Sequence, residues 1–199
     1  GDILKQVQIR SVSVQDFYDL VTANLDYYTG LNAATGGTWL CVSRIPERLK
    51  SAAGLDIYIE ELLAMQAQLT PLGQKLCFHP VSGDYTAVPG VNAMEYLLEH
   101  MPELEICLDL YHLNRNCGDM PGFIRRYGSR ICMVHFKDAT GDVLVPAGQG
   151  DTDWTGVFPA CHEIGVEYAF AEQESWEGDP FDRLKKGLDW VNEQNKKSG

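Results

Sequence analysis

The chain has 199 residues, 45% of them hydrophobic and 22% charged, with a formal net charge of −12. This length and composition fit one globular domain over residues 1–199. The charge disfavours binding to nucleic acid or to an anionic membrane, and no apolar stretch has the length of a membrane helix. No signal peptide and no C-x-x-C pair is present, and four of the six cysteines lie in short apolar runs. We therefore expect reduced thiols and a cytoplasmic protein.

Short apolar runs alternate with longer amphipathic stretches along the chain. The short runs are typical of strands buried on both faces, and the longer ones carry apolar residues at helical spacing. Asp16 could cap the first helix, and Asp179 followed by Pro180 could start the last. In chain order the sequence predicts a strand at 7–12, a helix at 16–28, a strand at 38–43, a helix at 55–69, a strand at 75–79, a helix at 93–100, a strand at 105–110, a helix at 122–127, a strand at 131–135, a helix at 155–164, a strand at 168–172 and a helix at 179–195.

Strand–helix repetition predicts a parallel α/β sheet, either open or closed into a barrel. No glycine-rich nucleotide-binding motif follows any strand, which removes the best evidence for an open nucleotide-binding sheet. Ionisable residues end four consecutive strands, and in a (β/α) barrel such strand ends converge on one mouth. We therefore expect a (β/α) TIM-type barrel. Six strands are predicted where a closed barrel has eight, so we expect about two N-terminal βα units to be missing. The chain could be truncated, the N-terminal part could be a separate chain, or a partner could cover the open edge.

The four residues at the strand ends are His79, Asp109, His135 and Glu172. Two imidazoles and two carboxylates suit Mn²⁺, Co²⁺, Fe²⁺ or Zn²⁺ better than Mg²⁺ or Ca²⁺, and Mn²⁺ is our first choice. Each residue alone could be a helix cap or a hydrogen-bonded core group. The set of four is harder to explain in that way, because Asp109 stands in an apolar strand, where a carboxylate is costly to bury. The sequence therefore predicts a divalent metal site.

Four motifs resemble those of the xylose isomerase-like TIM barrels, a family that includes sugar phosphate isomerases and epimerases. They are CLDLYHLNRNCGD, RICMVHFKDA, VPAGQGDTDW and YAFAEQES, and the resemblance runs from about residue 38 to 193. It implies Asp109, His135 and Glu172 as metal ligands. The strand ending at residue 79 supplies the fourth ligand, where the ketose epimerases have Glu-Pro and this chain has His79 and Pro80. This difference leaves open whether His79 binds metal or acts as a base, and Asp84 could compensate.

The resemblance implies an isomerase or epimerase of a sugar or sugar derivative. The reaction would be proton transfer through a metal-stabilised enediolate. Glu172 is the first candidate base, and His79 is the candidate on the opposite face. Lys137 lies two residues beyond His135, on the same side of an extended chain, and could polarise a substrate oxygen.

Several further residues could support this site. His112 and Glu174 could orient the metal ligands. Arg44 and Arg115 follow strands and could meet a phosphate or carboxylate on the substrate. Four aromatic side chains could provide apolar faces for a sugar ring: Trp39, Tyr111, Trp154 and Trp176. Core packing explains Trp39 and Trp154 equally well.

Two other functions stay open at this point. A metal-dependent lyase, such as a dehydratase of a keto-sugar or keto-inositol, would use the same residues. A non-catalytic barrel that binds a sugar or a partner chain is the second alternative. Cleavage of damaged DNA is disfavoured by the excess of acidic residues. The resemblance also implies a possible homo-oligomer, and we expect a small-molecule sugar substrate, with no nucleic acid and no membrane as partners.

Overall fold

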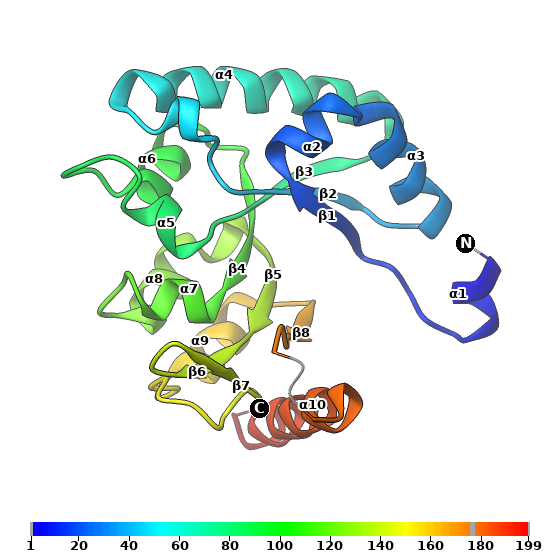
Figure 1. Cartoon of the computed structure of the whole chain (residues 1–199), viewed down its shortest axis with the longest axis vertical. Coiled ribbons are helices and arrows are strands. Elements are labelled where there is room, and N and C mark those ends of the chain that lie inside the picture. Colours follow the sequence, from blue (N-terminus) through cyan, green and yellow to red (C-terminus); the bar gives the residue numbers. More distant parts are fainter. Residues whose placement is uncertain (1, 176–177, 199) are drawn as a thin grey trace. The chain divides into compact units, whose positions relative to one another are not determined.

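A computed structural model describes residues 2–175 and 178–198 of the chain (Figure 1). Contacts between Cα atoms divide it into two compact units, Gly1–Glu105 and Ile106–Gly199. The elements before the boundary are α1 (Asp2–Gln6), β1 (Ser13–Phe17), α2 (Tyr18–Ala23), α3 (Leu25–Thr35), β2 (Trp39–Ser43), η1 (Glu47–Leu49), α4 (Ala52–Leu69), η2 (Thr70–Leu72), β3 (Lys75–His79), α5 (Ser82–Tyr85) and α6 (Ala93–His100). Those from the boundary onwards are β4 (Glu105–Asp109), α7 (Leu110–Asn114), α8 (Met120–Tyr127), η3 (Gly128–Arg130), β5 (Ile131–Phe136), β6 (Asp138–Thr140), β7 (Val143–Val145), α9 (Val157–Ile164), β8 (Ala169–Ala171) and α10 (Pro180–Ser198).

In the first unit β1, β2 and β3 are parallel and paired in that order. The register aligns their carboxyl ends, since Phe17 faces Ser43 and Ser43 faces His79. The last four residues of β2 and of β3 are buried, as expected for strands covered on both faces. The side chains that end these strands therefore lie at one edge of this part of the sheet.

The long helix α4 covers β3 in the first unit (Figure 1). Ser51 caps it, because its Oγ accepts a hydrogen bond from the backbone N–H of Gly54 at 3.0 Å. The buried residues recur every three or four positions and make one apolar stripe. They are Leu55, Tyr58, Ile59, Leu62, Met65 and Leu69. Full burial of one such leucine contributes about 1.5–3 kcal/mol, so the stripe holds the helix to the sheet.

The N-terminal expectations were partly wrong. The first strand is at Ser13–Phe17 and not at 7–12, where Val7 and Ile9 are more than half exposed. Backbone pairing with β2 selects this strand, although its own residues are only partly buried. Asp16 therefore lies inside a strand and caps no helix, and the expected helix at 16–28 is two helices that meet at Asn24.

In the second unit β4, β5 and β8 are parallel and paired in that order. Asp109 is the register partner of His135, and His135 is the register partner of Phe170. The pairing continues beyond β8, because the backbone N–H of Glu172 donates to the carbonyl of Phe136 at 3.0 Å. Unlike the buried strand that the sequence predicted, β8 is partly exposed, with Phe170 37% accessible.

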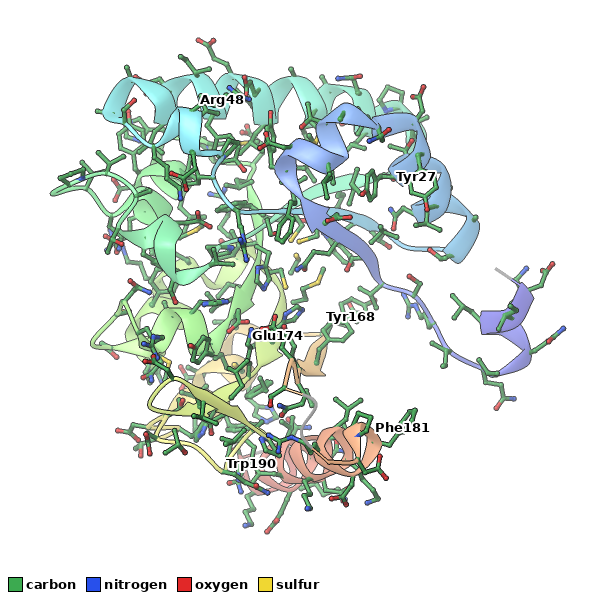
Figure 2. The ribbon with its side chains drawn as sticks, in the orientation of Figure 1. Tyr27, Arg48, Tyr168, Glu174, Phe181 and Trp190 are labelled. Atoms are coloured by element: carbon green, nitrogen blue, oxygen red, sulfur yellow. The ribbon has the colours of Figure 1, made fainter. Side chains whose placement is uncertain are left out.

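An aromatic cluster joins α10 to the rest of the second unit. Trp190 packs against Trp154 and Phe158, with ring centroids 5.1 and 5.5 Å away, and Phe158 stacks on Phe136 at 4.8 Å. Phe181, on the same helix, points away from the unit and is 81% exposed (Figure 2). The short antiparallel pair β6 and β7 was not predicted, because three-residue strands carry too little pattern to recognise.

Three parallel strands in each unit make six, two fewer than the eight of a closed (β/α) barrel. The remaining predicted helices are present, with ends that differ by a few residues. All six cysteines are free thiols, and Cys41, Cys77 and Cys107 are buried, as small core residues should be. Cys132 is half-buried and its thiol approaches the carbonyl of Ile106 at 3.3 Å.

Candidate metal centre

Asp109 ends β4 and is fully buried. Its Oδ1 accepts hydrogen bonds from the backbone N–H groups of Tyr111 at 2.8 Å and His112 at 3.1 Å, so the residue is the N-cap of α7. Its Oδ2 lies 3.9 Å from Nε2 of His112 and 4.0 Å from Nζ of Lys137. One oxygen therefore holds the helix, and the other faces the ionisable groups of the site.

His135 and Glu172 converge with Asp109. The strand register places His135 beside Asp109, and Nδ1 of His135 lies 2.6 Å from Oε2 of Glu172. One ligand atom from each of the three residues lies within 4.8 Å of the others. The second unit thus brings together three of the four predicted ligands.

Lys137 extends into the same cluster of carboxylates and is 4% exposed. Its Nζ lies 2.8 Å from Oε2 of Glu174, 3.5 Å from Oε1 of Glu172 and 4.0 Å from Oδ2 of Asp109. Burial lowers the pKa of Lys137, but the charge of Asp109, the hydrogen bond to Glu174 and the charge of Glu172 together outweigh it. The pKa therefore lies above its ordinary value. Lys137 is a cation at neutral pH and suits charge stabilisation, not proton abstraction.

The supporting residues of the second unit lie close to this cluster. Glu174, which is labelled in Figure 2, is half-exposed, and its carboxylate pairs with Lys137. Tyr111 lies beneath two cations, with Nζ of Lys137 and Cζ of Arg115 each 5.4 Å from its ring centroid. Arg115 itself pairs with Asp142 at 2.8 Å, so its charge is already matched. Trp154 belongs to the aromatic cluster described above and serves packing.

The donor set fits a divalent ion. One imidazole and two carboxylates converge. The cation Lys137 lies beside the carboxylates and is paired with Glu174. Mixed nitrogen and oxygen donors of this kind suit Mn²⁺, Fe²⁺, Co²⁺ or Zn²⁺. A divalent ion would also balance the buried charge of Asp109, which is costly without compensation.

Asp138 is a residue whose role the sequence reasoning missed. It is fully buried, and its Oδ1 accepts from the backbone N–H of Ala139 at 2.9 Å and from Oγ1 of Thr152 at 2.7 Å. Its Oδ2 accepts from the backbone N–H groups of Gly148 and Gly150, each at 3.0 Å, and from Nε1 of Trp154 at 3.3 Å. A Cβ on Gly150 would lie 2.3 Å from Oδ1, so this glycine has to stay small. Two motifs of the sequence, HFKD and GQGDTDW, thus meet at one carboxylate.

The remaining predicted residues, apart from Trp176, lie in the first unit. His79 ends β3 and is 4% exposed, and its place in the ligand set stays a prediction of the sequence. Asp84 is no spare ligand, because its two oxygens accept the backbone N–H groups of Ile45 and Val81, both at 2.9 Å. Arg44 follows β2, and Trp39 donates from Nε1 to Glu105. Trp176 lies outside the described residues.

Residues 33–194 match the family model described as xylose isomerase-like TIM barrel. The chain belongs to this family. The match extends over parts of both units, and the expected fold class, a (β/α) TIM-type barrel with about two βα units fewer than a complete one, is confirmed.

Solved structures show the same fold at low sequence identity. A sugar phosphate isomerase/epimerase from Parabacteroides distasonis is 16% identical with a TM-score of 0.77, over 96% of this chain and 73% of that one. The IolI protein with a bound zinc atom is 13% identical with a TM-score of 0.74, over 100% of this chain and 82% of its own. A probable 3-DHS dehydratase, AsbF, from Bacillus anthracis is 12% identical with a TM-score of 0.74, over 96% and 79%.

Curated protein sequences give no match to the chain. Among the helices of residues 2–175 and 178–198, none combines the length and the hydropathy that crossing a membrane requires.

Proposed function

We propose that this protein is a divalent-metal-dependent isomerase or epimerase that acts on a sugar or sugar derivative. The observation that carries the proposal is the convergence of Asp109, His135 and Glu172 beside the buried cation Lys137. The family and the named activity of the Parabacteroides structure support a sugar as the substrate class.

Asp109, His135 and Glu172 would hold the ion, and we propose His79 as the fourth ligand or as a base. Mn²⁺ is our first choice, and the zinc atom in IolI supports a divalent ion in general. A bound ion would act as a Lewis acid and stabilise negative charge on a substrate oxygen.

The chain's own groups would transfer the proton and stabilise the negative charge that develops on the substrate. Glu172 is our candidate for proton transfer, because its carboxylate is partly accessible and Lys137 lies 3.5 Å from Oε1. Lys137, held protonated by three carboxylates, would donate a hydrogen bond to a substrate oxygen as charge develops there. Glu174 would hold Lys137 in that position, and His112 would help to orient Asp109.

Metal analysis of the purified protein tests the site. We expect about one Mn, Fe, Co or Zn ion per chain, and loss of at least nine-tenths of it in His135→Ala. His162→Ala is the matched control, because this exposed histidine lies on α9 of the same unit. Metal retained in His135→Ala, or lost equally in both variants, would contradict the site.

Reaction in D₂O separates the candidate activities. An isomerase or epimerase incorporates deuterium at the carbon next to the carbonyl and gives a product that is otherwise unchanged in composition. A dehydratase gives a product lighter by one water. Keto-sugars, aldoses and keto-inositols, each with and without phosphate, form the substrate panel, and Glu172→Gln should lower kcat at least a hundredfold on the active one.

A metal-dependent lyase or dehydratase is the second candidate, favoured by the likeness to AsbF. It would use the same ion, and Glu172 would again remove the proton. The substrate would then lose a leaving group such as water, whereas in an epimerase a proton returns to the carbon. A barrel that only binds a sugar or a partner would bind without turnover. The cytoplasmic location, the absence of nucleic acid and membrane partners, and a homo-oligomeric state stay predictions of the sequence.

A further inference from the structure

A cavity lies wholly within the first unit, at the carboxyl ends of its three strands. Its volume is about 590 Å³, within the usual range of small-molecule sites. Phe17, Ser43 and Arg44 line it from the ends of β1 and β2, and Val81 and Gly83 line it from the segment after β3. We refer to it as the Arg44 cavity. In (β/α) barrels this end of the strands is the one that carries the active site.

The backbone at Arg44 is strained. Its φ is +64°, in the left-handed region that side chains with a Cβ adopt at a cost of about 1–2 kcal/mol. Asp84 helps to hold the turn, because its Oδ1 accepts the N–H of the next residue, Ile45, and its Oδ2 accepts that of Val81. A glycine would fit this turn without strain. Strained residues of this kind cluster at functional sites, so the Arg44 side chain is a candidate for binding a ligand in the cavity.

The other charged groups that line the cavity are one ion pair and two further carboxylates. Lys50 pairs with Glu47, Asp84 accepts hydrogen bonds from two backbone N–H groups, and Asp19 also belongs to the lining. Arg44 differs from these, since no carboxylate of residues 2–175 or 178–198 lies within ion-pair distance of it. Arg44 is therefore a cation at the rim of the cavity that has no ion-pair partner among the described residues, in a chain of net charge −12.

The guanidinium of Arg44 is also pre-oriented. Its Cζ lies 4.5 Å from the centroid of the Phe17 ring, a distance typical of a cation–π contact. Such a contact occupies a face of the planar group and leaves the N–H donors at its edge for a ligand. Those donors match the two oxygens of a carboxylate or phosphate.

We propose that the Arg44 cavity binds an anionic group, a phosphate or a carboxylate, on the substrate, with Arg44 as its anchor. The assignment of this anionic group to the substrate rests on the proposed function. It narrows the substrate class to acidic sugars. The binding of the anion itself depends on residues of the first unit alone.

Calorimetric titration of the metal-free protein tests the anchor separately from the metal site. The probes are glycerol 3-phosphate, glycerate and glycerol. We expect one of the two anions to bind and glycerol not to bind, and the anion that binds identifies the group. Arg44→Gly should weaken binding at least tenfold while its Tm stays at or above that of the wild type, because glycine relieves the strained φ.

Two further variants complete the design. Arg44→Lys should bind with intermediate affinity, since it keeps the charge but loses the two-pronged geometry. Arg115→Gln, an arginine of the second unit already paired with Asp142, should bind like the wild type. Equal binding by wild type and Arg44→Gly, or no anion binding by the wild type, would overturn the proposal. The metal content of His135→Ala bears only on the proposed function. Failure of the metal site and failure of the anion site are therefore distinguishable.

Discussion

Asp109 caps a helix and is also one of the metal ligands that we propose. A carboxylate after a strand is often only a helix cap, and Oδ1 of Asp109 does cap α7. The cap fixes the side chain, so that Oδ2 faces His112 and Lys137. The cap therefore fixes the position of the oxygen that we propose as a metal ligand.

Asp138 gives the clearest prediction for a single residue. Asp138→Asn replaces one accepting oxygen by an amide that would face N–H or O–H donors, and we expect the free energy of unfolding to fall by about 2–4 kcal/mol. Urea denaturation measures the change. Asp142→Asn is the control, because that side chain is 91% exposed and its loss should cost less than about 1 kcal/mol. Similar values for the two variants would show that the five hydrogen bonds contribute little.

Helix α10 shows how one element is held by one of its faces. Trp190 contacts the rings of Trp154 and Phe158, whereas Phe181 extends into solvent (Figure 2). The tight contact at Gly148, where a Cβ would lie 2.2 Å from the Trp190 ring, indicates that the loop after β7 is shaped to this helix.

We expect Trp190→Ala to lower the free energy of unfolding by about 2–3 kcal/mol, because it leaves a cavity in the aromatic cluster. Phe181→Ala, on the same helix, should change it by less than about 0.5 kcal/mol. Denaturation followed by far-ultraviolet circular dichroism gives both values. A small effect of Trp190→Ala would mean that α10 is held elsewhere.

At the scale of the whole chain, metal binding should be measurable as a change in stability. An ion that binds only the folded protein raises its stability by about 2.7 kcal/mol at a free concentration one hundred times its Kd. We expect Mn²⁺ to raise the Tm of the chelator-treated protein measurably.

His79→Ala should reduce this metal-dependent rise in Tm if His79 is a ligand, and metal titration should show at least tenfold weaker binding. His100→Ala is the matched control, because this exposed histidine of the first unit stacks on Tyr96. If His79→Ala bound Mn²⁺ as tightly as His100→Ala, the ligand role of His79 would be wrong and its alternative as a base would stand.

The sequence by itself determined the repeating strand–helix order, the family and the positions of the ionisable strand ends. Periodicity reports burial, so the buried strands β2 and β3 and the stripe of α4 could be read from it. It could not place β1 or the short strands β6 and β7, because backbone pairing and not side-chain pattern selects them. It also did not show the break at Asn24, where φ is −140° and ψ is 41°, outside the helical region.

Only the tertiary structure decided which polar groups meet. The register that sets Asp109 beside His135 brings together residues 26 positions apart, and the carboxylates around Lys137 set the direction of its pKa. The same holds for Asp84, which the sequence offered as a possible ligand, and for Asp138, whose role the sequence did not indicate. Both are acceptors for backbone N–H groups. The physical reason is that hydrogen bonds and charges act over a few ångströms in space, whatever the distance along the chain.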